Sequence, residues 1–214
     1  DEALLKIDSL VKSKKSHHVA FINAHCLNIA YKNKEYRKVL DNCSEVFADG
    51  IGAKIGAKIL GYKVEENVNG TDMFPILAQK AYRIYLFGGA PGVASKALEN
   101  ARKLNGKAEF AGCADGFFME KSEAEIFSEL AELNIDILLV ALGVPKQEEW
   151  IKCNLDKLSG CTAVGVGGLL DFVSERIPRA PRWMRKLNIE WCFRLYCEPS
   201  RLFKRYIIGN PLFI

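Results

Sequence analysis

Long hydrophobic runs are missing from this chain of 214 residues, although 49% of its residues are hydrophobic. No uninterrupted apolar stretch approaches the roughly 18 to 20 residues that a membrane-spanning helix needs. A leader of the signal-peptide type is missing too. We therefore expect a folded protein with a substantial core that does not cross a membrane. Because the chain begins Asp1-Glu2-Ala3 without methionine, we also expect a shortened chain or a piece of a longer one.

Paired cysteines and closely paired aspartates are also missing. The seven cysteines form no Cys-x-x-Cys pair, so we interpret them as small core residues in a reducing compartment rather than as metal or redox ligands. No Asp-x-Asp pair is present to hold Mg²⁺ against a nucleotide diphosphate. Arginine or lysine would have to meet such a charge. The nearest pattern, Glu123-Ala-Glu125, is typical of a solvated helical face.

Positive charge is concentrated towards the C-terminus. Residues 176–205 carry nine Lys or Arg and two Glu, whereas the rest of the chain is slightly acidic. Near Glu175 the alternation of strand and helix patterns also stops. We therefore predict an α/β domain over residues 1–175 and a helical, basic and aromatic appendage over residues 176–214, which we call the tail. Within it, Pro199 predicts a short helix that opens near Ser200.

Apolar runs of strand length alternate with segments of helical periodicity before the tail. The predicted strands cover residues 18–23, 45–48, 83–87, 107–111, 136–142 and 162–166. Continuous apolar strands joined by helices predict a Rossmann-like, mostly parallel sheet with helices on both faces. In such sheets ligands bind outside the carboxyl ends of the strands, so the residues there are the first candidates for a site.

Asp49 is the candidate catalytic acid. It stands in "FADGIG", between a predicted strand and two glycines, where a carboxylate could approach a substrate and accept a proton from a hydroxyl nucleophile. The alternative is that Asp49 caps the helix that follows. His25, after the first predicted strand, is likewise open to a structural or a catalytic role.

Two further strand ends predict contact with an anionic ligand. In "LFGGAPG", Gly88 and Gly89 permit close backbone approach to a phosphate, and Glu109 follows at about the distance of a ribose-binding acid, which leaves an NAD-dependent oxidoreductase as an alternative. In "ALGVPKQEEW", Lys146 and Gln147 are expected in the first helical turn. A cation there is unfavourable for the helix dipole and is better explained by an anionic ligand, with a solvated lysine as the alternative.

The tail combines a helical apolar stripe with basic residues. Trp183, Leu187, Trp191 and Leu195 recur every four residues, which predicts one amphipathic helical face. Aromatic anchors among arginines and lysines favour contact with anionic lipid. A nucleic acid backbone and a plain amphipathic helix packed on the domain are the alternatives.

Six segments occur in an order that is similar to one known family. They are "DGIG", "NGTD", "FGG", "ALGVPKQEEW", "GVGGLLDF" and "RAPRWMRKLNIEWCFRLYCEPSRLFKRY". Together they resemble the WecG/TagA/CpsF family of bacterial glycosyltransferases. The resemblance implies an inverting enzyme, independent of metals and cofactors, that moves a hexosamine-type sugar such as N-acetylmannosamine. It implies a UDP-sugar donor and an undecaprenyl-diphosphate-linked acceptor, in the synthesis of cell-surface polysaccharide or teichoic acid.

The resemblance also implies roles for individual residues. Asp49 is expected to deprotonate the acceptor hydroxyl, while Arg194 and Arg201 close over the site and neutralise the UDP leaving group, with Lys204 or Arg205 in support. The expected donor-binding residues are Asn23, Gly50, Gly88, Gly89, Phe117, Lys146, Gln147 and Asp171. The expected membrane-binding residues are Arg182, Trp183, Arg185, Trp191, Lys204 and Arg205.

The implied location is peripheral, on the cytoplasmic face of the plasma membrane. The expected partners are a UDP-sugar, a polyprenyl-diphosphate-linked acceptor and an anionic membrane surface, without nucleic acid and with homo-oligomers left open. Two departures from the family pattern leave the donor and acceptor sugars open. Phe21 stands where many members have Thr, and Asn67 stands where many have Arg. A non-catalytic module that senses nucleotide sugars or lipid is a further alternative.

Overall fold

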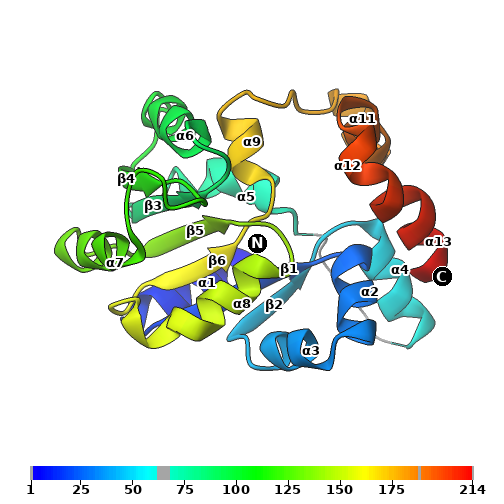
Figure 1. The fold of residues 1–214 in the computed structure, drawn as a ribbon, viewed down its shortest axis with the longest axis horizontal. Coiled ribbons are helices and arrows are strands. Elements are labelled where there is room, and N and C mark those ends of the chain that lie inside the picture. The colour runs from blue at the N-terminus through cyan, green and yellow to red at the C-terminus, as the bar shows by residue number, and fades with distance from the viewer. Residues whose placement is uncertain (1, 62–67, 188, 214) are drawn as a thin grey trace.

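A six-stranded, fully parallel sheet forms the centre of the protein (Figure 1). The computed structural model describes residues 2–61, 68–187 and 189–213. The sheet has the order β2-β1-β6-β5-β3-β4. Its strands are β1 (His17–Ile22), β2 (Glu45–Ala48), β3 (Arg83–Gly88), β4 (Glu109–Ala114), β5 (Ile137–Ala141) and β6 (Thr162–Gly165). The predicted α/β fold and all six predicted strands are confirmed.

Helices cover both faces of this sheet. One face packs against α1 (Glu2–Lys12), α5 (Gly70–Leu77), α6 (Val93–Arg102) and α9 (Leu169–Val173). The other face packs against α2 (Ala24–Lys32), α3 (Lys34–Asp41), α7 (Glu123–Glu132) and α8 (Lys146–Asn154). The result is a three-layer arrangement in which the ends of the strands are the places left for a ligand.

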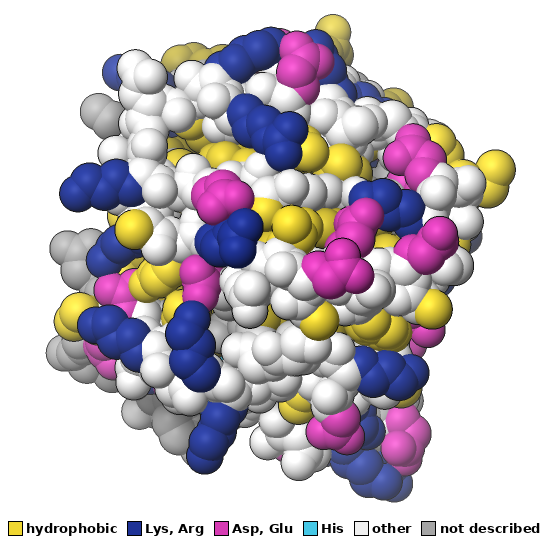
Figure 2. All heavy atoms as spheres, turned by 90° about the vertical axis from the view of Figure 1, so that its left-hand side faces the viewer, with side chains coloured by type: hydrophobic (Ala, Val, Ile, Leu, Met, Phe, Trp, Pro, Cys, Tyr) yellow, Lys and Arg dark blue, Asp and Glu magenta, His cyan; other side chains and the backbone are white. Residues whose placement is uncertain are grey.

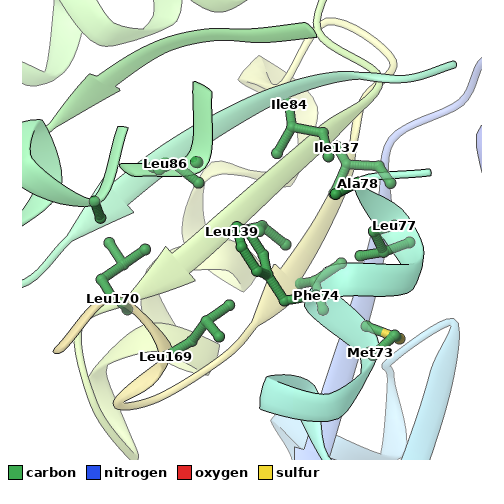
Figure 3. Close-up of a cluster of buried hydrophobic side chains, with 14 of the residues drawn as sticks. Met73, Phe74, Leu77, Ala78, Ile84, Leu86, Ile137, Leu139, Leu169 and Leu170 are labelled. Carbon is green, nitrogen blue, oxygen red and sulfur yellow. The ribbon is translucent and has the colours of Figure 1, made fainter. Parts of the chain in front are cut away.

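Strand β5 shows why the sheet is so apolar. Ile137 and Leu139 pack into the cluster drawn in Figure 3, together with Phe74 of α5 and Leu170 of α9. The intervening Leu138 belongs to the cluster on the opposite face. Successive side chains of a strand point to opposite faces, so a strand covered on both sides must be apolar throughout.

The start of strand β4 differs from the prediction. The apolar pattern placed the strand at residues 107–111, but β4 covers Glu109–Ala114. The backbone N–H groups of Lys107 and Ala108 both donate to the carbonyl oxygen of Ala78, at 2.9 and 3.0 Å. Because these donors are used outside the sheet, the ladder begins later than the side-chain pattern suggested.

The tail contains several short helices instead of one continuous stripe. They are α10 (Arg182–Lys186), α11 (Glu190–Cys197), α12 (Pro199–Phe203), the π-helical η2 (Lys204–Ile208) and α13 (Gly209–Phe213). Pro199 opens α12, as predicted. The expectation of one amphipathic face from Trp183 to Leu195 is wrong, because the N–H of Ile189 donates back to the carbonyl of Met184 at 3.0 Å and ends the first helix. The division of the chain into two units near Glu175 stays a prediction.

The tail returns to the sheet domain at α2 and α4 (Ile51–Ile59) (Figure 1). The side-chain amide of Asn28 donates to the carbonyl of Gly209 at 2.7 Å. The Phe213 ring lies against Gly56 of α4. Across the part of the chain that the structure describes, every helix is too short or too polar to cross a bilayer.

Candidate active site

A pocket of about 1040 Å³ opens where the carboxyl ends of the strands face the tail. Its walls come from the residues that follow β1, β2, β5 and β6, from the start of α4, and from α11 to α13. A space of this size exceeds what a small metabolite needs and is ample for a sugar nucleotide. The sequence segments that follow the strands therefore meet in one cavity, as the parallel sheet requires.

Asp49 lies in this pocket beside Asn23. Asn23 caps α2, because its Oδ1 accepts from the backbone N–H groups of His25 at 3.0 Å and Cys26 at 3.3 Å. Its amide is thereby held in place to hydrogen-bond the Asp49 carboxyl group. Burial raises the pKa of Asp49 to about 6, and the charges of Arg205 and Arg194 and the bond to Asn23 counter part of that rise. A carboxyl group whose pKa is raised towards neutrality is suited to accepting a proton.

The alternative role of Asp49 as a helix cap is wrong. The residue at the N-cap of α4 is Gly50, whose φ of 90° lets the chain turn from the strand into the helix. Asp49 precedes that position, and its backbone N–H donates to the carbonyl of Ile22 at 2.7 Å. The Asp49 side chain is therefore left to the pocket.

His25 also lines the pocket but stays neutral. Burial lowers its pKa to about 4, and the neighbouring charge of Arg205 acts in the same direction. Because the pKa of His25 lies below that of Asp49, Asp49 is the better proton acceptor of the two.

Arg194 and Arg205 bring positive charge from the tail to Asp49. The Arg194 guanidinium lies 4.9 Å from the centre of the Phe172 ring, and a Cβ at Gly168 would come within 2.6 Å of its Nη2. The Arg194 side chain thus passes close to the backbone at Gly168. The Nε atoms of both arginines are buried without a hydrogen-bond partner among the described residues. Buried donors of this kind are costly unless a ligand satisfies them.

Arg201 lines the same pocket. It is exposed and forms an ion pair with Glu198, one turn earlier. An exposed pair of this kind contributes little to stability, so Arg201 can turn to an anionic ligand at low cost.

Gln147 and Glu148 are two buried residues of α8 whose side chains form a hydrogen bond with each other. Gln147 Nε2 donates to Glu148 Oε1 at 2.7 Å, while Gln147 Oε1 accepts from the backbone N–H of Gly167 at 3.0 Å. Both side chains are buried, and burial raises the pKa of Glu148 to about 7. Gln147 lines the pocket; its Oε1 fixes the turn between β6 and α9, while its Nε2 bonds to Glu148 within α8.

Four other predicted donor-binding residues line the pocket, namely Gly50, Phe117, Lys146 and Asp171. Phe117 is exposed at the mouth, in a loop held by Asp115, whose carboxyl group accepts from the N–H of Phe117 at 2.8 Å. Lys146 is the first residue of α8 and is exposed. Asp171 is paired with Arg176 at 3.1 Å, so its charge is partly met within the protein.

The two glycines at the carboxyl end of β3 differ in position. Gly89 lines the pocket. Gly88 does not, because it is buried within β3, where a Cβ would meet the Ala141 backbone at 2.5 Å. Its role in this structure is close packing against β5.

The geometry argues against the oxidoreductase alternative. Glu109 is the first residue of β4, paired with Arg83 at 3.0 Å, and therefore lies at the amino end of its strand. The pocket and Gly89 lie at the carboxyl ends. A ribose-binding acid must stand at the same end of the sheet as the glycine-rich turn, so Glu109 cannot serve that role.

The predicted membrane-binding residues divide into two groups. Arg185, Trp191 and Arg205 line the pocket. Arg182, Trp183 and Lys204 are exposed and lie outside its lining. Position in the tail alone did not separate these groups, because the short helices rotate successive side chains to different sides.

Some pocket residues were missed at the level of sequence. Glu190 and Tyr206 line the cavity from the tail, and Phe172 lines it from α9. Within residues 176–205, Glu190 is one of two acidic residues among nine basic ones, and this isolated acid is a signal in the sequence that points to a specific role.

Asp72 of "NGTD" forms ion pairs with Arg179 and Arg185, and so ties the tail to α5. Asn67 lies outside the described residues, and Phe21 lines the pocket while packing on Phe47.

Comparison with known proteins points to one family. The whole chain, residues 1–214, matches the family described as "Glycosyl transferase WecG/TagA/CpsF family". Two relatives carry the name N-acetylglucosaminyldiphosphoundecaprenol N-acetyl-beta-D-mannosaminyltransferase. The relative from Bacillus spizizenii is 31% identical over 189 residues, which cover 86% of this chain and 72% of the relative. The relative from Bacillus subtilis is 28% identical over 187 residues, with the same coverage of 86% and 72%.

Proposed function

The chain belongs to the WecG/TagA/CpsF family of glycosyl transferases, and we propose that it moves an N-acetylmannosamine-type sugar from a UDP-sugar to GlcNAc-diphosphoundecaprenol. The names of the two relatives support this acceptor and this sugar. The observation that carries the proposal is the Asp49 carboxylate in the large pocket, with Asn23 and two arginines of the tail around it.

Asp49 serves as the general base. The acceptor hydroxyl oxygen attacks the anomeric carbon of the donor sugar, its proton passes to Asp49, and the bond between that carbon and the UDP oxygen breaks with inversion. A base positioned in this way contributes a factor of about 10² to 10⁴ in rate. Asn23 holds the carboxylate in place for this transfer.

The arginines of the tail neutralise the departing UDP. Arg194 and Arg205 line the pocket, and Arg201 can join them by leaving Glu198. Guanidinium groups are well shaped for bidentate contact with phosphate oxygens. In this proposal these cations take the part that a metal ion plays in other transferases, so no metal or other cofactor is needed.

The exposed part of the tail holds the enzyme at the cytoplasmic face of the membrane. Trp183 and Leu187 are exposed apolar side chains close to Arg182. An aromatic anchor beside basic residues suits the interface of an anionic bilayer. A lipid-linked acceptor would then be presented directly to the pocket.

Turnover of UDP-sugars with GlcNAc-diphosphoundecaprenol in liposomes, in the presence of EDTA, tests the proposal. The wild type should transfer one hexosamine preferentially, and Asp49→Asn should lower kcat by about 10² to 10⁴. Asp41→Asn removes a comparable carboxylate from the exposed end of α3 and should leave kcat unchanged. Absence of transfer from every UDP-sugar, or full activity in Asp49→Asn, would overturn the proposal.

A further inference from the structure

Helix α4 connects the pocket to an exposed apolar surface. Ile51 and Ile55 both line the pocket, and they are 41% and 45% exposed. Ile59, one turn further along, is 70% exposed. Residues four apart lie on the same side of a helix, so the three side chains form one continuous strip, which we call the isoleucine face.

The other side of α4 explains why the isoleucine face is turned outward. A Cβ at Gly52 would lie 3.1 Å from the Ala24 Cβ of α2, and a Cβ at Gly56 would lie 2.6 Å from the Phe213 ring of α13. Each glycine follows an isoleucine and is therefore rotated by about 100° around the helix. Close packing at the two glycines sets the orientation of α4, and among the described residues the isoleucine face stays exposed beside the pocket.

We propose that the isoleucine face binds the isoprenoid chain of the lipid-linked acceptor as it leaves the pocket. This inference rests on the proposed function. The acceptor hydroxyl has to reach Asp49, which stands two residues before Ile51. The diphosphate and the hydrocarbon chain must then leave the pocket along a wall, and the isoleucine face begins within the pocket and extends about 12 Å along the helix axis.

The surroundings of α4 favour a lipid chain as the occupant. The relatives are named for an acceptor that carries undecaprenol, a long hydrocarbon. Helix α13 of the tail packs against α4, and Figure 1 shows the two side by side. The isoleucine face therefore lies beside the tail, another part of which we propose to touch the membrane. A hydrocarbon chain that runs along this face is removed from water, which is favourable in proportion to the apolar area buried.

A chain-length experiment tests this inference. The acceptors are GlcNAc-diphosphate lipids with an undecaprenyl chain or with a two-isoprene chain, both in detergent micelles and with saturating donor. Ile59→Glu should raise KM for the undecaprenyl acceptor about tenfold and leave KM unchanged for the short acceptor and for the donor. Leu5→Glu, on α1 outside the pocket lining and 68% exposed, is the matched control and should change neither KM. Ile59→Gln should leave Tm unchanged. It should raise KM for the undecaprenyl acceptor by less than Ile59→Glu does, again without a change of KM for the short acceptor.

The outcomes separate the inference from its alternatives. Equal KM values for wild type and Ile59→Glu, or equal changes with both acceptors, would overturn it. So would unchanged KM values combined with weaker binding of Ile59→Glu to vesicles of anionic phospholipid, which would assign the face to membrane acyl chains. Unchanged KM values with a loss of dimers in sedimentation would assign it to a second copy of the chain. No transfer by the wild type to either acceptor would instead mean that the proposed function itself has failed.

Discussion

Strand β5 and helix α11 are held in place by different means. Every side chain of β5 is at most 8% exposed, and the strand packs into clusters on both faces of the sheet. Each residue of α11 is half-buried or exposed. The sheet domain is thus stabilised by its own core, whereas the tail is held by its contacts with α2, α4 and α5. The residues of α11 are consequently free to serve the pocket instead of the packing.

The two regions also differ in how they use charge. On the face formed by β4, α6 and α7, basic and acidic side chains are intermixed (Figure 2), as in the pairing of Glu99 with Lys96 and Lys103 at 2.8 and 2.6 Å. In the tail, positive charge is in excess, and Arg194, Arg201 and Arg205 line the pocket. Intermixed charge keeps a surface soluble, while an excess of arginine around a cavity suits an anionic ligand.

Deletion of residues 176–214 is the change with the largest expected effect, because it should abolish most of the activity and leave the sheet domain folded. We expect turnover to fall by about 10³-fold or more, because the arginines that face the pocket are lost together. The remaining domain should still unfold cooperatively, since its core clusters lie almost entirely before Glu175. Transfer assays and thermal unfolding followed by circular dichroism check both parts. An active truncated protein would show that the tail is not needed for transfer. A truncated protein without a cooperative transition would show that the sheet domain does not fold on its own core.

A matched pair of leucine substitutions compares the stability of the two regions. Leu139→Ala in β5 should lower the free energy of unfolding by about 2 to 5 kcal/mol, because a fully buried side chain leaves a cavity. Leu195→Ala in α11 should cost less than about 1 kcal/mol, because that side chain is only half-buried. Urea unfolding of both variants measures the difference. Similar losses would show that the tail is part of the same core.

The smallest expected effect concerns pH. Asp49 has to be ionised to accept a proton, so kcat should rise with pH through about 6. Arg205→Gln removes a cation that favours the ionised form, so the pKa of Asp49 should rise. The acidic limb of the kcat–pH profile should then move to higher pH by up to about one unit. Lys204→Gln removes the same charge outside the pocket lining and should leave the limb in place. The pH dependence of kcat, measured in micelles, distinguishes the two variants. Equal shifts of the acidic limb in both variants would mean that Arg205 acts only through the overall charge.

The sheet was predictable because its rules are local. Runs such as "IDILLV" are apolar at every position, as a strand buried on both faces requires, and the six strands were found with small changes at their ends. The start of β4 moved because the backbone N–H groups of Lys107 and Ala108 bond to the carbonyl of Ala78, the residue that follows α5. Asp49 was also accessible from sequence, because a carboxylate between a strand and two glycines can hardly lie anywhere but at the end of the sheet.

The tail was predictable in composition but not in arrangement. Its arginines and aromatic residues are evident in the sequence, and so is Pro199 at the start of a helix. Which of them face the pocket was decided by the break after α10, by the narrow space at Gly168 that admits Arg194, and by the packing of Phe213 on Gly56. The sequence by itself determined the α/β sheet, the acid at its edge and the basic character of the tail, because side-chain periodicity and composition are enough for these. Only the tertiary structure decided which cations meet Asp49, because that depends on contacts between segments more than 100 residues apart.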